Sequence, residues 1–403
     1  MATTSDAVAL PAAPSRLFTG NFLRLCIAAL LFMGSMFVVV PVLPLYVKSV
    51  GGTEIDVGLV MGSFTLTSLV LRLMVGRWLD QGWRRRRLLW TGVGIFFAAA
   101  LIYPVARAIA PLLGLRLFQG TGMALYNTTS TSLVAESVPL TRLGEAMGFY
   151  GMATTLGMAV APALGAAILG WSGGFLPVFV ASGVLVVLAG VVTFGIQEPP
   201  RKEAKHVRWR DLFNRRAWLP FVLALSASSA FTVILTFLPL LVEARGHGNA
   251  GLFFTVYSLI TLVVRVVAGR ASDRFGRGVA IVPGLLATGA ALAVLALFAS
   301  PAGFWAAAVV FGLGFGISNP ALSALSVEVV PADQRGSAIA TYVAGFELGI
   351  GAGSIAFGPI LQASGFTTAF LIAAATPILG AILYVVTIGA RRPSSHPQEV
   401  LPC

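Results

Sequence analysis

Residues that commonly bind metals or form disulfide bonds are scarce in this sequence. Its 403 residues include only two cysteines and three histidines. Cys26 lies inside the first apolar run and Cys403 is the last residue, so neither position suggests a disulfide bond or a metal site. The histidines, His206, His247 and His396, all fall in predicted loops. We therefore predict no bound metal and no other cofactor.

The sequence also lacks the motifs of an enzyme or an ATP-driven pump. It contains no Gly-Lys-Ser/Thr loop that could hold the phosphates of a nucleotide. The glycine-rich stretches GTGMA and GLGFG lie inside apolar runs and are not typical of dinucleotide-binding loops. No histidine is placed to complete a catalytic triad. These absences predict that the protein is not an enzyme.

Charge is scarce as well, at 10% of residues, whereas 57% are hydrophobic. Soluble domains carry about 25% charged residues, so this chain has too little polar surface to fold in water. At about 20 residues per crossing, its length accommodates about twelve transmembrane helices. The apolar runs cover residues 20–47, 57–79, 88–107, 110–135, 143–169, 175–196, 218–243, 250–270, 279–299, 304–328, 337–362 and 367–390. The first run is too long for a cleaved signal peptide. We expect an all-α membrane protein with twelve transmembrane helices in two pseudo-symmetric six-helix bundles.

The net charge of +12 is unevenly distributed between the predicted loops. Most lysines and arginines fall on one side of the membrane, and Lys48, Arg107 and Arg245 fall on the other. Because basic loops stay in the cytoplasm, this pattern predicts a multi-pass protein with both termini cytoplasmic. It also argues against a nucleic-acid partner. The Arg-, Gly- and Ala-rich composition favours a bacterial inner membrane.

One long polar segment, 197–217, divides the chain into two halves of six runs each. The predicted organisation is a cytoplasmic tail (1–19), an N-terminal six-helix bundle (20–196), a cytoplasmic linker (197–217), a C-terminal six-helix bundle (218–390) and a second cytoplasmic tail (391–403). Each half contains an even number of helices, so both insert in the same orientation. Parallel repeats of this kind predict a substrate site between the halves, near the middle of the membrane.

The two halves are related as an internal repeat. LVLRLMVGRWLD in the first half aligns with LVVRVVAGRASD in the second, and GLGFG aligns with the region of GTGMA. Arg72, Gly76, Arg77 and Asp80 correspond in this way to Arg265, Gly269, Arg270 and Asp273.

Glu347 breaks this repeat, because its counterpart in the first half is Thr155. No charged residue lies within ten positions of it on either side. An isolated charge at the centre of a bilayer costs about 2.5–3.5 kcal/mol even on the most lenient scale, which makes it a candidate for a functional role. The carboxylate is predicted to bind the transported proton or a cationic substrate. The alternative is a permanently paired acid with a structural role.

The best-defined motif follows the second run of each half. The second half reads Gly269-Arg270-Ala271-Ser272-Asp273-Arg274-Phe275-Gly276-Arg277, whereas the first half has Gln81 and Trp83 at positions where Arg and Gly are usual. With this motif, residues 18–390 resemble the major facilitator superfamily, and within it the twelve-span drug:proton antiporter branch. The resemblance implies alternating access of a small molecule and protons, driven by rocking of the two bundles.

The same resemblance implies a cytoplasmic gate. Asp80 would face the start of the eleventh span near Gly336 and Ser337, and Asp273 would face the start of the fifth span near Gly144. Arg77 and Arg270 would reach the acids that end the fourth and tenth spans. The predicted gate residues are Gly76, Arg77, Asp80, Gly269, Arg270, Asp273, Arg274, Glu136, Glu328, Arg72 and Arg265. The alternative is charge pairing at helix ends that only fixes topology.

Two further motifs point to the antiporter branch. RLFQGTGMA, beginning at Arg116, matches a family pattern in which the arginine is implicated in proton coupling, so Arg116 is predicted to tune Glu347. The alternative is an arginine that snorkels to the outer surface. LGMAVAPALG carries Gly157, Pro162 and Gly165 of a pattern that marks exporters, although it has Ala161 in place of one glycine. The alternative is close helix packing alone.

Candidate cavity residues are polar, aromatic or Met side chains on spans that should face the centre. They are Asn127, Asn319, Met33, Met36, Phe37, Phe149, Tyr150, Phe231, Tyr257, Tyr342 and Phe346. Met and aromatic side chains suit adaptable apolar ligands. For the aromatic residues, packing between helices or against lipid is the alternative.

These observations together predict a monomeric proton-coupled exporter of small lipophilic or amphipathic compounds, with the lipid bilayer, protons and the transported molecule as its partners. Two alternatives stay open at this stage. One is a proton-coupled uptake symporter for a small nutrient, and the other is a flippase for lipids or lipid-linked precursors.

Overall fold

The computed structural model describes residues 17–139, 142–198, 213–331 and 334–389. The predicted tails (1–19 and 391–403) and the linker (197–217) therefore lie largely outside the described residues. The first half of the chain contains α1 (Gly20–Phe37), α2 (Leu43–Ser49), α3 (Glu54–Asp80), α4 (Arg85–Ile102), α5 (Ile109–Glu136), α6 (Leu143–Ser172) and α7 (Leu176–Phe194). The second half contains α8 (Trp218–Arg245), α9 (Ala250–Phe275), α10 (Gly278–Leu297), α11 (Pro301–Glu328) and α12 (Arg335–Tyr384).

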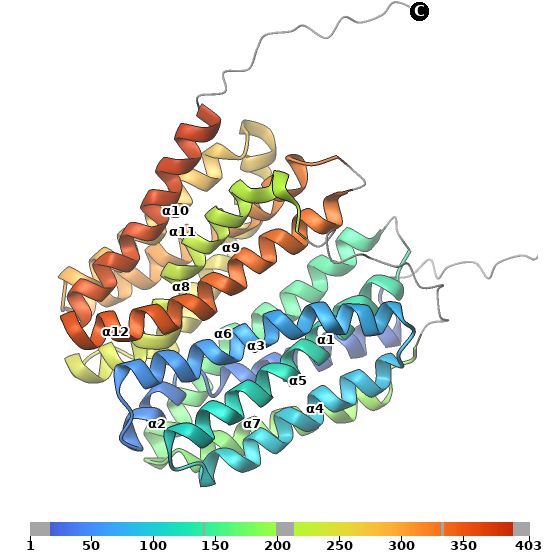
Figure 1. The fold of residues 1–403 in the computed structure, drawn as a ribbon, viewed down its shortest axis with the longest axis horizontal. Coiled ribbons are helices and arrows are strands. Elements are labelled where there is room, and N and C mark those ends of the chain that lie inside the picture. Colours follow the sequence, from blue (N-terminus) through green and yellow to red (C-terminus); the bar gives the residue numbers. More distant parts are fainter. Residues whose placement is uncertain (1–16, 140–141, 199–212, 332–333, 390–403) are drawn as a thin grey trace, which may run out of the picture.

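The helices form two bundles, one from each half of the chain, which are seen in Figure 1 as blue-to-green and yellow-to-red groups. Nine helices within the described residues are long and apolar enough to cross a membrane, and α9 carries a shorter apolar stretch, Ala250–Arg265. The twelve predicted runs correspond to these helices and α5, with α1 and α2 sharing the first run. α12 contains the last two runs. The expected all-α membrane fold is thus confirmed.

Two crossings depart from straight helices, for reasons found in the sequence. α1 ends at Phe37, and residues 38–42 are not helical before α2 begins at Leu43. Pro41 cannot donate a backbone hydrogen bond, whereas Pro44 occupies the first turn of α2, where none is needed. α12 is interrupted at Gly365, whose φ of 75° and ψ of 175° suit glycine alone. The chain reverses there, so α12 supplies two antiparallel crossings.

The ends of the molecule can be told apart by the loops that they carry. We call the end with Asp80, Glu136 and Arg335, where the two halves are connected, the linker end. The opposite end, with Glu54, Ser172 and Gly365, is called the far end. In each bundle the helices run alternately from one of these ends to the other.

The two bundles touch mainly through α3 with α12 and α6 with α9. Small residues bring the backbones together in the far half of this seam. A Cβ atom added at Gly62 would clash with the carbonyl of Gly351, and one added at Gly251 would lie 2.6 Å from the carbonyl of Pro162. Thr255 of α9 donates a hydrogen bond to the carbonyl of Ala159 in α6, at 2.8 Å.

Contact is lost toward the linker end. Glycines near the linker ends of the same four helices have no described atom within 4 Å of a Cβ position. They are Gly76, Gly144, Gly148, Gly151, Gly269 and Gly336. Among the described residues, the bundles are therefore closed against each other in the far half of the seam and separated at the linker end.

Within the first bundle, close packing also depends on glycine. A Cβ atom at Gly92 of α4 would lie 2.9 Å from the carbonyl of Gly122 and from Cβ of Tyr126, both in α5. Gly94, two residues along, has open space at the same position. Transmembrane helices associate through such small residues because lipid provides no hydrophobic drive between them.

This contrast gives the first prediction. Gly92→Val should destabilise the protein by about 1–3 kcal/mol, because α4 and α5 must move apart to hold the added carbons. Gly94→Val should have little effect. Thermal unfolding of the detergent-purified variants measures both, and equal melting temperatures for the two variants would contradict the packing described.

Candidate functional site

The central feature of the seam is an ion pair between Glu347 and Arg72. Nη2 of Arg72 in α3 lies 2.6 Å from Oε1 of Glu347 in α12, so the pair joins the two bundles. Glu347 lies about 18 Å along α12 from its start at Arg335, and Arg72 about 12 Å from the end of α3 at Asp80. In a hydrocarbon core about 30 Å thick, both charges lie well inside the membrane.

The pair lies where contact between α3 and α12 gives way to separation. Glu54 contacts Gly358, Gly62 contacts Gly351, and Arg72 pairs with Glu347. One turn further along α3, Gly76 has no described atom of another helix within 4 Å of a Cβ position. The Glu347 side chain is 14% exposed and that of Arg72 is 26% exposed. The pair is thus partly accessible from the side on which the bundles are apart.

This ion pair is not saturated with hydrogen bonds. Oε2 of Glu347 and Nε of Arg72 are buried and have no hydrogen-bond partner among the described residues. Buried polar atoms are rarely left unpaired, so such atoms point to a site that binds a proton, water or ligand. Glu347 is paired in this conformation. A permanently paired acid with a structural role, the alternative to proton coupling, would be paired in the same way.

Arg116 does not contact Glu347, which corrects the prediction that it tunes this acid. Its guanidinium donates hydrogen bonds to Oε1 of Gln119 at 2.8 Å and to the Val60 carbonyl at 3.3 Å, and it lies 4.2 Å from the ring centre of Phe64. Tyr103 donates a hydrogen bond to the same Gln119 oxygen, at 2.8 Å. Arg116 is 4% exposed, so it does not snorkel to the surface either.

The acids predicted for the gate have different partners from those expected. Glu136 pairs with Arg85 at 2.8 Å instead of Arg77, and Glu328 pairs with Arg277 at 2.5 Å instead of Arg270. The reason is geometric, because α4 and α10 begin beside the ends of α5 and α11, so that Arg85, the first residue of α4, and Arg277, the N-cap of α10, reach these acids. The hydrogen bond from Arg277 to Glu328 also raises the pKa of the guanidinium.

In the described part of the chain, the contacts between the bundles that were predicted for Asp80 and Asp273 are not made in this conformation. Asp80 is exposed, and no described atom lies within 4 Å of a Cβ position at Gly336 or Gly144. Asp273 pairs with Arg277 of its own bundle. Arg270 is exposed and the guanidinium of Arg274 lies over the ring of Phe275. Arg72 belongs to the central ion pair and not to the gate.

Three of the predicted cavity residues meet in one aromatic cluster of the second bundle. Phe231 stacks on Phe315 with ring centres 4.9 Å apart and lies 6.4 Å from Phe346, the neighbour of Glu347. Tyr257 packs edge-on against Phe311, at 5.5 Å. Sequence reasoning missed Phe311 and Phe315, although their spacing of four residues places both on one face of α11.

The other cavity candidates lie mostly inside their own bundles. Tyr150 shares a hydrogen bond with Ser130 at 3.0 Å, and Tyr342 donates one to the Asn319 backbone carbonyl at 3.2 Å. Phe149 packs edge-on against Phe18, with ring centres 5.0 Å apart, and so has a neighbour outside the predicted cavity set. The remaining four are buried or half-buried: Met33, Met36, Phe37 and Asn127.

The glycines of the predicted exporter motif pack α6 against α1. A Cβ atom at Gly165 would clash with the carbonyl of Val38 in the non-helical segment, and one at Gly157 would lie 2.7 Å from the carbonyl of Leu30. On its other side α6 meets α9, where Pro162 contacts Gly251. The motif therefore lies in the closed half of the seam.

Arg265 of α9 is the repeat counterpart of Arg72, but it has no acidic partner in the described part of the chain. It is half-buried, its Nε is buried without a hydrogen bond, and its electrostatic neighbours are Tyr342 and Tyr257. It therefore lies beside the tyrosines of the second bundle, away from the gate in which it was predicted.

Comparison with known proteins identifies the fold and the family. The model of the Major Facilitator Superfamily matches residues 25–254 and 246–401, nearly the whole chain. The chain belongs to the Major Facilitator Superfamily. It is a multi-pass membrane transporter of this type and not an enzyme.

Relatives within the superfamily are distant but match over most of their length. The chain is 24% identical to the staphylopine export protein of Staphylococcus aureus, covering 93% of this chain and 98% of the relative. It is 23% identical to an MFS-type transporter of Methanocaldococcus jannaschii, covering 87% and 93%. Among solved structures, a D-xylose-proton symporter superposes with a TM-score of 0.73 at 20% identity, covering 90% of this chain and 96% of that one. The nucleoside transporter NupG also superposes with a TM-score of 0.73, at 14% identity, covering 91% and 99%.

The surroundings of Arg116 give the second prediction. Arg116→Met should lower stability by about 2–4 kcal/mol, because it removes charged hydrogen bonds and a contact with an aromatic face in a buried site. Arg116→Lys should recover part of this loss, and Arg87→Met, at an exposed arginine, should lose little. Melting temperatures in detergent measure the series. Normal stability of Arg116→Met with loss of transport would instead support the predicted coupling role.

Proposed function

We propose that this MFS transporter exports small amphipathic compounds in exchange for protons, with Glu347 as the proton-binding group. The observation that carries the proposal is the Arg72–Glu347 ion pair, because it joins the two bundles inside the membrane where they begin to separate. A titratable acid at this place links the protonation of one side chain to the contact between the bundles.

The coupling follows from the charge on the carboxylate. When Glu347 is ionised, its attraction to Arg72 holds α12 against α3. A proton removes the negative charge and hence most of this attraction, which leaves Arg72 without its counter-charge. Proton binding at this one site therefore weakens the seam, and proton release restores it. A substrate that contacts the pair would compete with one of these two states.

The distribution of basic residues supports the orientation. Arg84, Arg86 and Arg87 lie at the linker end, as do Arg215 and Arg216, whereas the far end has few cations. By the positive-inside rule the linker end is cytoplasmic. Separation of the bundles at this end then corresponds to a transporter that is open to the cytoplasm and ready to load a molecule for export.

Two further observations support export of amphipathic compounds. The chain is similar over almost its whole length to a staphylopine export protein, and the exporter motif lies in the closed half of the seam. The aromatic cluster of Phe231, Phe311, Phe315, Phe346 and Tyr257 adjoins Glu347 through Phe346 and offers apolar faces to a ligand.

The third prediction concerns substrate-driven proton flux. Inside-out vesicles with an imposed pH gradient, followed by a quenched dye, should release protons when a transported compound is added. Glu347→Gln should reduce this release about tenfold or more, because the amide cannot bind the proton. Glu145→Gln, which changes an exposed acid, is the matched control and should retain it.

Folding must be checked in the same experiment, because Glu347→Gln leaves Arg72 buried without a counter-charge. The double variant Arg72→Gln/Glu347→Gln removes both charges and should fold while still failing to couple. Flux retained in Glu347→Gln would contradict the role of this residue. Accumulation driven by an inward gradient would indicate an uptake symporter, and movement of labelled lipid alone would indicate a flippase.

A further inference from the structure

The internal repeat places two arginines at equivalent positions, and only one has an acid to pair with. Arg72 and Arg265 occupy the same place in α3 and α9, and Arg72 meets Glu347 of the opposite bundle. The repeat counterpart of Glu347 is Thr155 in α6, whose hydroxyl donates to the carbonyl of Gly151. Since α9 packs on α6 as α3 packs on α12, Arg265 should face Thr155 across the seam.

The surroundings of Arg265 leave its charge unbalanced. In the described part of the chain it makes no ion pair and no side-chain hydrogen bond, and its Nε is buried. Burying an unpaired charge is costly, and the cost falls when an anion is bound. The planar guanidinium also suits carboxylate and phosphate, to which it can donate two parallel hydrogen bonds.

The net charge of the site has the same consequence. Arg72 and Glu347 neutralise each other, whereas Arg265, at the equivalent position of α9, keeps a positive charge that has no acidic partner in the described residues. Tyr257 lies about 12 Å from Arg265 along α9 and is part of the aromatic cluster. A ligand that reaches both would carry an anionic group at one end and an aromatic or apolar body at the other.

We infer that Arg265 binds the anionic group of the transported molecule, so that the substrates are amphipathic anions, carrying a carboxylate or a phosphate. This inference rests on the proposed export function and specifies its substrate class. An isolated Glu347 would favour cationic substrates. Because Arg72 already provides the counter-charge of Glu347, we expect anionic substrates instead.

The fourth prediction concerns a variant in which an introduced glutamate takes the place of the anionic ligand of Arg265. Thr155→Glu should form with Arg265 the pair that Glu347 forms with Arg72, and should raise the melting temperature above that of Thr155→Gln. In the Arg265→Gln background the same glutamate should lower it, since it has no partner in the membrane. Thr155→Glu that destabilises equally in both backgrounds would overturn the inference. The measurement needs no ligand.

Ligand binding supplies the second test. Detergent-purified protein is titrated with 2-naphthoate, 2-naphthamide and 2-naphthylmethylammonium, which share one ring system and differ in charge. Naphthoate should stabilise the wild type most, and this preference should disappear in Arg265→Gln and in Thr155→Glu but persist in Arg87→Gln. No stabilisation of the wild type by naphthoate, or a preference that survives Arg265→Gln, would contradict the inference.

These binding assays use no proton gradient, so the two proposals can fail separately. A preference for anions without substrate-driven proton flux would leave Arg265 in its role and refute proton-coupled export. Proton flux that is driven by cationic compounds and unaffected by Arg265→Gln would support proton-coupled export and refute the role of Arg265.

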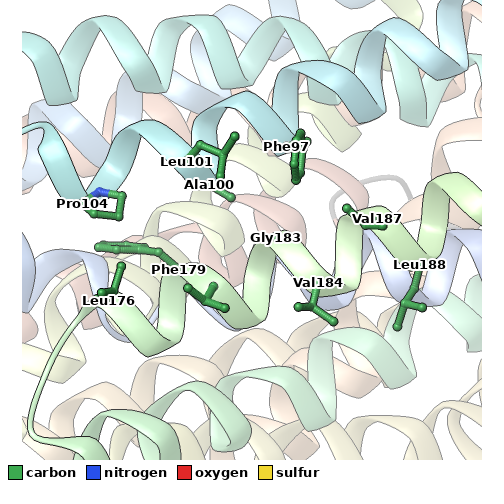
Figure 2. A pocket seen from close by; sticks show the side chains of 11 residues that line it. Phe97, Ala100, Leu101, Pro104, Leu176, Phe179, Gly183, Val184, Val187 and Leu188 are labelled. Atoms are coloured by element: carbon green, nitrogen blue, oxygen red, sulfur yellow. The ribbon is translucent and has the colours of Figure 1, made fainter.

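A second and independent feature lies on the outside of the first bundle, between α4 and α7. A groove of about 490 Å³ is lined by apolar residues of these two helices and of the turn after α4, Tyr103–Val105. It extends from Pro104 and Leu176 at one end to Phe97 and Leu188 at the other, as Figure 2 shows. Leu176 and Leu188 are about 18 Å apart along α7, slightly more than half of a hydrocarbon core about 30 Å thick. The groove therefore has the depth of one leaflet.

The mouth of this groove carries a cation. A second pocket, of about 480 Å³, shares Pro104, Leu176 and Phe179 with the groove and adds Arg107, Tyr46 and Ser49 at the far end. Arg107 is exposed and makes no side-chain hydrogen bond or ion pair in the described part of the chain.

The other cations at this end are satisfied. Lys48 pairs with Glu54 at 2.9 Å, and Arg245 donates to the carbonyls of Leu295 and Ala296. Arg107 alone among the three therefore has its charge available to a ligand from the membrane surface.

We propose that an anionic phospholipid of the leaflet at the far end occupies this site, with its phosphate on Arg107 and an acyl chain in the groove. Attraction between the phosphate and Arg107 and burial of the acyl chain in the groove would both stabilise the bound lipid. Free phosphate would contact Arg107 but not the groove, so a substitution in the groove distinguishes free phosphate from a phospholipid.

The fifth prediction is tested by native mass spectrometry of the full-length protein with phosphatidylglycerol or phosphatidylcholine. The wild type should retain more phosphatidylglycerol than phosphatidylcholine. Arg107→Gln should lose this preference, and Val184→Trp, which fills the groove at an exposed position, should reduce binding of the lipid. Lys48→Gln is the control and should behave as wild type. Equal retention of both lipids by the wild type, or no effect of Val184→Trp, would overturn the proposal.

Discussion

The contact between Arg72 and Glu347 is the interaction on which the rest of the structure depends. Each charge is costly alone in hydrocarbon, and the two lie on different bundles, so their mutual attraction offsets this cost only when α3 and α12 meet. The pair lies at the edge of the closed half of the seam, where one turn of α3 separates contact from open space. A change of charge at this place therefore acts directly on the surface that the two bundles share.

The rest of the seam is formed by small residues instead of polar contacts. Gly62, Gly251 and Gly351 let backbones approach in the far half, while the glycines of the linker ends have no described atom within 4 Å of a Cβ position. Because lipid is as apolar as the helices, such contacts are held by close packing rather than by a hydrophobic drive. Contacts of this kind contain few hydrogen bonds or ion pairs that would have to break if the two bundles separated at the far end.

The two halves share a fold but differ in their charges. Arg72 has Glu347 as its partner, whereas the repeat counterparts of these two residues are Arg265 and Thr155, and Arg116 is matched by Ala308 in the second half. Arg116 belongs to the interior of its own bundle, where it binds Gln119 and Val60. What is duplicated in the chain therefore builds the scaffold, and what departs from the repeat places both Glu347 and an Arg265 without an acidic partner in the described residues in the second half.

The sequence by itself determined the twelve apolar runs, the division into two halves and the isolated position of Glu347, because length, hydropathy and repeat spacing are properties of the chain alone. The predicted limits of the runs agree with the helix ends to within a few residues, but residues 38–42 divide the first predicted run, 20–47, into α1 and α2. Only the tertiary structure decided which arginine meets Glu347, and which arginines meet Glu136 and Glu328. In the sequence, Arg72 and Arg116 are alike, because each is a charged residue within an apolar run. Which of them meets Glu347 depends on which helix faces the other bundle, and only the tertiary structure determines this.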